Sequence, residues 1–294
     1  MPPDLTLADP GTRDALMHSI QSCVPDATLL PIGLETLRLA DPGRAHDLPE
    51  VILQARERSR INDTYVYDLD VYEPGGALVE QWRGLRLQAV RKLDGSGPWL
   101  PVLLGPYLER NAEPMVGAGI SIAVAPVGTP AGALLHRDRG ALALSGSSRG
   151  PAGTGDVPYL ATSAAVPVTI SSPAAGISFA LAGGRLLGGA VEVAAPGQAE
   201  ELAAWLGTDG FTLARRLADR GESIQAAVAR VKGAVESLRA SGQARGPVSE
   251  AAGNWPEGWT VLQSGDMTMA SFATTLQQVD SPVVFTLLAR TSAS

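Results

Sequence analysis

Residues 64–92 read TYVYDLDVYEPGGALVEQWRGLRLQAVRK, the longest strand-like pattern in the first part of the chain. In residues 64–72 aromatic or branched residues alternate with aspartate, which is typical of a strand with one buried face. The segment EPGG supplies turn-forming Pro and Gly, and the alternation resumes in residues 77–93. The stretch therefore predicts an antiparallel β-hairpin.

A helix is predicted before this hairpin. Residues 14–24, DALMHSIQSCV, place apolar residues roughly at helical spacing, with Asp14 favourable in the first turn. One helix beside several antiparallel strands indicates an α+β fold. Four prolines in residues 95–119 are expected to break regular structure, so we place a domain seam near residue 115.

The second half also has an α+β pattern. Short β-prone runs such as VPVTIS, GISFALAG and GAVEVAAP are separated by Gly or Pro, and the chain ends in further strand-like runs. Residues 198–219 and 222–242 have helical periodicity. We therefore expect two domains, residues 1–115 and 116–294.

Composition excludes several kinds of partner. The formal net charge of −7 and the lack of a Lys/Arg cluster argue against a nucleic-acid surface. No apolar run is long enough to span a membrane and no signal peptide is evident, so a cytoplasmic location is expected. Cys23 is the only cysteine and the chain has three histidines, so any metal would be held by oxygen atoms.

Several segments of the first half resemble one family in the right order. They are DALMHSIQSCVPDATLLPIGLETLRL from Asp14, ARERSR from Ala55, the hairpin itself, and LLGPYLER from Leu103. Together they resemble the second hotdog repeat of the dehydratase domain in enediyne-type iterative type I polyketide synthases. The resemblance implies a hotdog fold, an antiparallel sheet around a helix.

The resemblance also implies catalytic residues. In the family's D-x-x-x-H motif, Asp14 would be the general acid and His18 the residue one helical turn on, able to orient it. The reaction removes water from a 3-hydroxyacyl thioester, and the acid is expected to be partly buried with a raised pKa. On residue type alone, Asp14 would be a first-turn helix acid and His18 a structural histidine.

The family's first hotdog repeat, which supplies a histidine base in an H-x-x-x-G-x-x-x-x-P segment, has no equivalent in this sequence. His136, in HRDRG, matches only H-x-x-x-G and lies in the second half. We therefore expect an incomplete dehydratase, which is either part of a longer synthase or the partner of a separate protein that supplies the histidine.

Residues from about 120 to 290 resemble the phosphopantetheinyl transferase domain that ends enediyne synthases, most clearly in ARVKGAVESLRASG and GWTVLQSGDMTMASFATTL. Active members transfer the pantetheine arm of coenzyme A to an acyl carrier protein and use Mg²⁺ held by carboxylates. The family's W-x-x-K-E-A motif aligns with residues 232–237, which keep the acid as Glu236 but begin with Lys232.

The family's metal-binding D-x-E aligns with Ala190, Val191 and Glu192, so its first acid is lost. Glu192 and Glu236 are the remaining candidate metal ligands. The family's Ser-His pair that contacts the coenzyme A phosphate aligns with Ser171 and Ser172, so Ser172 replaces the histidine, and Arg137 aligns with a basic residue that faces coenzyme A. We expect this domain to be degenerate, with coenzyme A and Mg²⁺ as cofactors only if it is active.

Three functions stay open. The first is dehydration within a polyketide synthase, with an acyl carrier protein and upstream synthase domains as partners and a homodimer as the expected assembly. The second is a non-catalytic scaffold or carrier-protein docking module. The third is residual Mg²⁺-dependent phosphopantetheinyl transfer.

Overall fold

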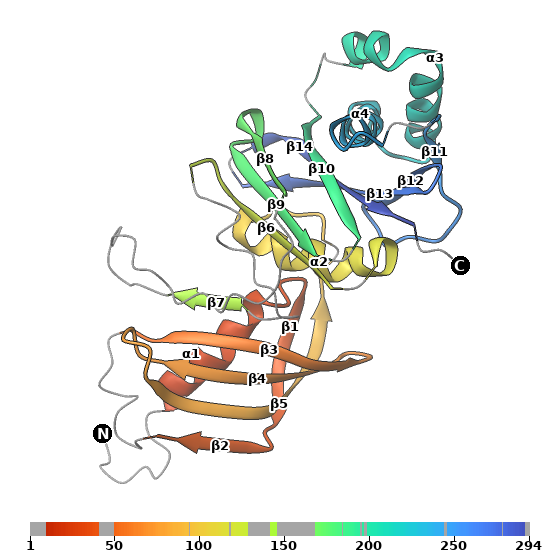
Figure 1. The fold of residues 1–294 in the computed structure, drawn as a ribbon. Helices are drawn as coiled ribbons and strands as arrows, with labels where there is room; N and C mark the ends of the chain where they lie inside the picture. The colour runs from red at the N-terminus through yellow and green to blue at the C-terminus, as the bar shows by residue number, and fades with distance from the viewer. Residues whose placement is uncertain are drawn as a thin grey trace. The chain divides into compact units, whose positions relative to one another are not determined.

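The computed structural model describes most of the chain. The described residues are 10–40, 50–93, 95–117, 119–128, 142–145, 168–183, 185–194, 196, 199–243, 246–277 and 279–291. They fall into two compact units (Figure 1). The first unit contains the described residues up to 93 together with 142–145, and the second contains the rest.

The first unit is built on an antiparallel sheet with the order β1-β5-β4-β3-β7, in which β2 also pairs with β5. Its strands are β1 (Ala27–Gly33), β2 (Thr36–Leu39), β3 (Ile52–Ile61), β4 (Thr64–Tyr72), β5 (Leu78–Lys92) and β7 (Leu142–Ser145). Strands β4 and β5 pair in antiparallel register, with Tyr65 opposite Leu87. The predicted hairpin is confirmed.

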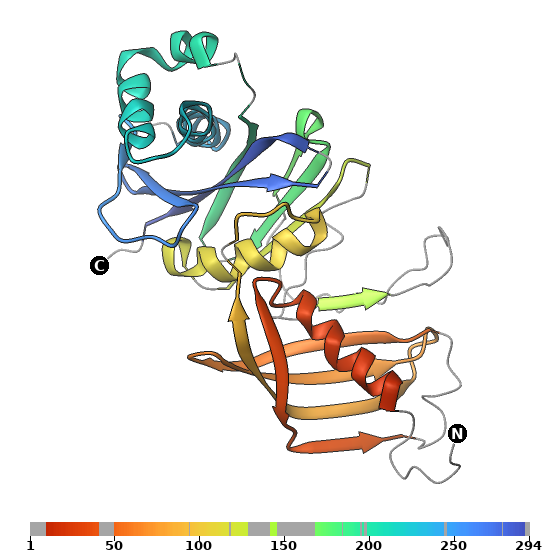
Figure 2. The same cartoon turned by 180° about the vertical axis from the view of Figure 1, so that it is seen from behind.

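Helix α1 (Pro10–Ser19) and the 3-10 turn η1 (Ile20–Ser22) lie on one face of this sheet, as Figure 2 shows from behind. The alternation in β4 sends Tyr65, Tyr67, Leu69 and Val71 toward the helix, where all four are buried. Leu16, Ile20 and Val24 are among the residues that complete this core. An antiparallel sheet packed on a helix agrees with the predicted α+β class and is consistent with a hotdog-like arrangement.

The start of the first helix differs from the prediction. The helix begins at Pro10, one turn before Asp14, because the fixed φ angle of proline suits the first turn of a helix. Asp14 therefore lies in the second turn, and its expected interaction with the positive end of the helix dipole is weaker than predicted.

A β-bulge bends β5 opposite β4. The register shifts between Tyr67 and Leu69, and Gly84 on β5 has a positive φ of 65°. The backbone N–H of Gly84 donates to Asp68 Oδ1 at 2.8 Å, so the extra residue of the bulge keeps a hydrogen-bond partner. Glycine is favoured here because a Cβ is strained at this φ.

The second unit contains two antiparallel sheets, with the orders β10-β14-β13-β12-β11 and β6-β9-β8. Its strands are β6 (Ile120–Pro126), β8 (Val168–Ser172), β9 (Ile177–Gly183), β10 (Leu186–Val193), β11 (Ser249–Glu250), β12 (Trp259–Ser264), β13 (Met267–Leu276) and β14 (Val279–Arg290). Its helices are α2 (Pro101–Val116), α3 (Ala199–Ala218), α4 (Ile224–Ala240) and the 3-10 turn η4 (Pro173–Ala175).

Helix α2 corrects a prediction, since its prolines were expected to break regular structure. Pro101 occupies the start of the helix, where no backbone donor is needed, and Pro106 and Pro114 lie inside it. Each internal proline removes at most one backbone hydrogen bond. The burial of Leu104 and Leu108 offsets this cost, so tertiary packing outweighs the local preference.

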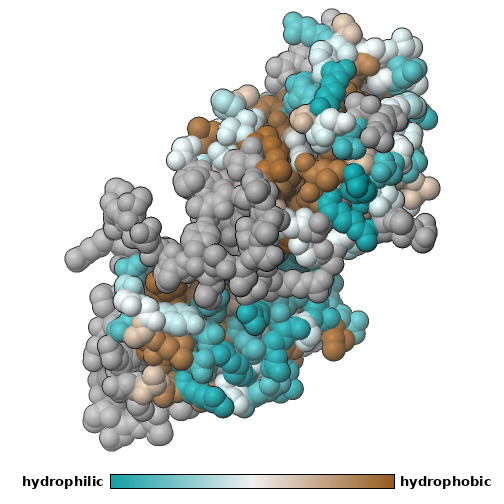
Figure 3. Space-filling model, viewed as in Figure 1, coloured by the Kyte–Doolittle hydropathy of each residue, from teal (hydrophilic) through white to brown (hydrophobic). Residues whose placement is uncertain are grey.

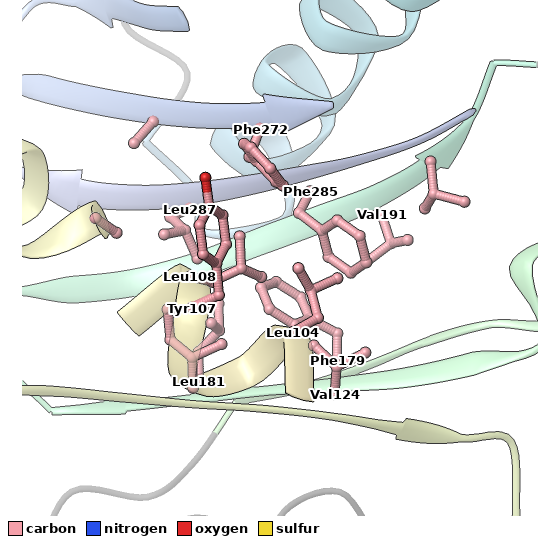
Figure 4. Close-up of a cluster of buried hydrophobic side chains, with 14 of the residues drawn as sticks. Leu104, Tyr107, Leu108, Val124, Phe179, Leu181, Val191, Phe272, Phe285 and Leu287 are labelled. Carbon is pink, nitrogen blue, oxygen red and sulfur yellow. The ribbon is translucent and has the colours of Figure 1, made fainter. Parts of the chain in front are cut away.

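The core of the second unit gathers around α2 (Figure 4). Tyr107 of α2 packs against Phe272 of β13 with ring centroids 5.2 Å apart. Phe179 of β9 meets Phe285 of β14 edge to face at 5.3 Å. Residues from both sheets and from α2 therefore share one apolar core.

The predicted seam near residue 115 lies inside the second compact unit. Residues 101–116 form α2, which packs on β6, β13 and β14, so the described residues divide after Leu93 instead. Among the described residues, no helix is long and apolar enough to cross a membrane.

Candidate functional site

The first candidate site is on α1 and contains the predicted catalytic pair. His18 Nδ1 lies 2.9 Å from the carbonyl oxygen of Asp14 and 3.3 Å from its Oδ1. The two side chains therefore share one face of the helix, as the four-residue spacing predicts. The structure brings this pair together.

The expected burial of Asp14 is not found in the chain by itself. The side chains of Asp14 and His18 are 64% and 65% exposed, because they lie on the face of α1 that points away from Leu16 and the core. A carboxyl group this exposed keeps its hydration. The predicted general acid would be shielded from water only if another chain segment covered α1.

A buried ion pair that the sequence analysis missed lies next to Asp14. Arg13 Nη2 donates to Glu80 Oε1 at 3.0 Å, and the indole Nε1 of Trp82 donates to Glu80 Oε2 at 3.0 Å. The Glu80 side chain is 2% exposed and that of Arg13 12%. Glu80 precedes Trp82 by two residues on one strand. Residues at this spacing face the same side of a sheet, so the sequence indicates that Glu80 faces the core with Trp82.

The opposite face of the same sheet is polar, and Figure 3 shows it as mostly hydrophilic. A shallow hollow of about 280 Å³ lies over it, lined by Gln54, Arg56, Asp68, Asp70, Tyr72 and Arg83. Arg83 Nη2 donates to Asp70 Oδ1 at 2.6 Å, and Gln81 donates to the same oxygen at 2.9 Å. The lining holds two arginines and two aspartates, so the hollow offers little net charge to a ligand.

The second candidate site lies between β10 and α4 and contains the predicted metal ligands. Lys232 Nζ donates to Glu192 Oε2 at 2.7 Å and lies 3.5 Å from Glu236 Oε1. Glu192 comes from β10, whereas Lys232 and Glu236 are one turn apart on α4. The structure thus brings the two glutamates to one place, with a lysine between them.

Buried contacts fix α4 at this position. Ser223 caps the helix by accepting a hydrogen bond from the N–H of Ala226 at 3.2 Å. Arg230, 3% exposed, donates to the carbonyl oxygens of Ser271 at 2.6 Å and Gly258 at 2.8 Å. Gly233 packs so closely that an added Cβ would lie 2.8 Å from Thr286 Oγ1.

The environment of the glutamates changes their proton affinity. The pKa of Glu192 is raised to about 7, mainly by burial and also by Glu236, although Lys232 acts in the opposite direction. Burial lowers the pKa of Lys232, but its hydrogen bond to Glu192 and the charges of both glutamates outweigh that effect, so the pKa is raised. Lys232 therefore carries a positive charge.

The residues at this site do not fit the Mg²⁺ ion that the resemblance implies. An ammonium group lies between the two carboxylates, and the first acid of the D-x-E motif is Ala190, which is buried. Among the residues that the structure describes, no group of three or more His, Cys, Asp or Glu side chains is arranged to hold a metal. The geometry of the site therefore supports no step through Mg²⁺.

The predicted coenzyme A residue Ser172 lies in a different sheet from Glu192. Ser172 is buried at the end of β8, opposite Ile177 of β9. Arg137 and His136 lie outside the described residues.

Comparison with known families bears on the first unit. Residues 2–96 match the family model described as polyketide synthase dehydratase N-terminal domain. The match covers α1 and strands β1 to β5, so it supports a polyketide synthase dehydratase region in the first unit. No curated protein and no solved structure matches the chain.

The matching model is described as the N-terminal domain of the dehydratase, whereas the segments from Asp14 onward resemble the second repeat. In the family the first repeat carries H-x-x-x-G. Within residues 2–96 the histidines are His18 and His46, and the residues four positions on are Ser22 and Glu50. Assignment to one repeat or the other stays a prediction.

Proposed function

We propose that the first unit is a dehydratase repeat of a polyketide synthase that acts on 3-hydroxyacyl thioesters of an acyl carrier protein. The single observation that carries the proposal is the family match over residues 2–96, which covers the helix with Asp14 and the sheet on which it packs. The finer assignment to an enediyne-type iterative synthase rests on the resemblance of the segments from Asp14 and Leu103.

In this proposal Asp14 is the general acid. A histidine of another repeat takes a proton from the α-carbon of the thioester, the α,β double bond forms, and the β-hydroxyl leaves as water with a proton from Asp14. His18, 3.3 Å from the Asp14 carboxylate, orients it. The elimination of water involves no net oxidation or reduction, so the reaction needs no redox cofactor.

The exposure of Asp14 sets a requirement on the assembly. A carboxyl group that donates a proton near neutral pH needs a raised pKa, which burial supplies. Because Asp14 is 64% exposed in this chain, the repeat that supplies the histidine must also cover the outer face of α1. A second copy of the chain in the expected homodimer, or an upstream synthase domain, would cover this face of α1.

Dehydration can be measured directly on the acyl carrier protein. The chain is mixed with the repeat that supplies the histidine and with 3-hydroxyacyl carrier protein, and loss of the mass of one water is followed with time. We expect Asp14→Asn to slow water loss by about 10²-fold or more. Asp266→Asn is a matched control, because Asp266 is 62% exposed and lies in the second unit. Equal rates in the wild-type chain and Asp14→Asn would rule out the acid role.

A non-catalytic docking module is the second candidate, and the exposure of Asp14 and His18 favours it. In that case the chain binds a carrier protein but does not change its thioester. Binding that is retained, with no loss of water in any assembly, distinguishes this function from catalysis.

For the second unit we propose descent from a phosphopantetheinyl transferase. Its support is that Glu192 and Glu236, 44 positions apart in the sequence, converge as the family's ligand motifs require. Residual transfer is disfavoured by Lys232 between them. Incubation with coenzyme A, Mg²⁺ and an apo carrier protein tests it, and a gain of the mass of the pantetheine arm would restore the transferase function.

A further inference from the structure

The carboxylates of Glu192 and Glu236 are bridged by one lysine. Lys232 Nζ is 2.7 Å from Glu192 and 3.5 Å from Glu236, and the side chains of Glu192 and Lys232 are 14% and 23% exposed. Carboxylate oxygens are also the ligands that divalent cations such as Mg²⁺ prefer.

Helix α4 and strand β10 lie close together near the lysine. Ala190 lies two residues before Glu192 on β10, so both face α4. A Cβ on Gly233 of α4 would lie 3.6 Å from the Cβ of Ala190, which shows that helix and strand are in near contact here. A longer side chain at position 190 would therefore extend toward α4.

An ammonium group differs from Mg²⁺ in the contacts it makes. It offers three N–H donors and one positive charge on a flexible stem, whereas Mg²⁺ requires near-octahedral oxygen ligands at short distances. A covalently attached ammonium also has no dissociation equilibrium. It links β10 to α4 at every metal concentration.

We infer that Lys232 takes the place of a divalent cation between Glu192 and Glu236, so that the wild-type chain binds no metal at this point and removal of the lysine creates a metal site. The inference concerns the second unit and does not rest on the dehydratase function of the first. Its test needs no enzymatic activity.

The test compares Mn²⁺ binding and thermal unfolding of the full chain in three forms: wild type, Lys232→Met, and Lys232→Met with Glu192→Gln. Methionine keeps most of the apolar stem but removes the charge. We expect Mn²⁺ to raise the unfolding midpoint of Lys232→Met by about 2–4 °C. We expect no shift in the wild type or in the double variant.

Two results would overturn the inference. One is a Mn²⁺-dependent shift in the wild type that Glu192→Gln abolishes, since the lysine would then not exclude the metal. The other is a folded Lys232→Met variant that binds no Mn²⁺. If Lys232→Met does not fold, direct Mn²⁺ binding to the wild type and to Glu192→Gln decides: uptake that depends on Glu192 contradicts the inference, and no uptake by either supports it.

Discussion

At the scale of single residues, the buried Glu80 carboxylate makes stability depend on its partner Arg13. The Glu80 side chain is 2% exposed and is held by Arg13 and the Trp82 indole. Arg13→Met would leave a buried charge without its cation, and such losses cost about 3–5 kcal/mol. Chemical denaturation should show this decrease in the free energy of unfolding.

Two controls separate the ion pair from general effects of removing an arginine. Arg290→Met removes an arginine that is 58% exposed and should change stability by less than about 0.5 kcal/mol. Adding Glu80→Gln to Arg13→Met should recover much of the loss, because the buried group is then neutral. A loss of equal size in Arg13→Met and Arg290→Met would contradict the proposed role of the pair.

Glu192 gives the chain a pH-dependent stability. Folding raises its pKa from about 4.5 to about 7, so the folded state holds the proton more tightly than the unfolded state does. The resulting stability is complete below pH 4.5 and is lost as the pH rises through about 7. Because the group is partly exposed, we expect an effect on the order of 1 kcal/mol.

The measurement is the free energy of unfolding between pH 4.5 and 8 for the wild type and for Glu192→Gln. Glutamine cannot titrate, so the variant should lose this part of the pH dependence while other groups contribute equally to both. Parallel curves for the two proteins would show that Glu192 titrates at its ordinary pKa.

At the scale of elements, the packing of α4 on its sheet depends on Gly233. A Cβ at this position would lie 2.8 Å from Thr286 Oγ1, which is buried. Gly233→Ala should destabilise the chain by about 1–3 kcal/mol through overpacking, despite the better helix propensity of alanine. Thermal unfolding measures the effect.

Thr286→Ala provides the matched test of this contact. It removes the atom that the new methyl group would meet, so the double variant should be more stable than Gly233→Ala alone. If Thr286→Ala instead lowers the stability of Gly233→Ala by as much as it lowers that of the wild type, the two residues are not coupled. The close contact would then not determine how α4 packs on the sheet.

The elements that could be predicted from the sequence are those in which local pattern and tertiary packing agree. The alternation in residues 64–72 predicts both β4 and its buried face, because one side of the sheet packs on α1. Helix α2 could not be predicted, since its prolines indicate a break and only burial against distant strands favours a helix.

The candidate sites follow the same rule. Asp14 and His18 are one turn apart, so the sequence alone predicts that they are neighbours. The position of Lys232 between two glutamates depends on how α4 packs across β10, and no local pattern contains that information. Glu80 was missed because its charge suggested solvent, although its register with Trp82 indicated the core.

At the scale of the whole molecule, the two units differ in what supports them. The first unit combines a family match over residues 2–96 with a helix that presents an acid and a histidine on one face. In the second unit Glu192 and Glu236 meet at the ammonium group of Lys232. We therefore expect the catalytic activity to depend on the first unit.

The most direct test replaces Asp14 by Asn in the gene and follows the thioesters bound to the carrier protein in the producing cells by mass spectrometry. We predict that the Asp14→Asn strain accumulates 3-hydroxyacyl thioesters, whereas wild type and the exposed control Asp266→Asn yield the species that has lost one water. Dehydrated thioesters at the wild-type level in the Asp14→Asn strain would contradict the account.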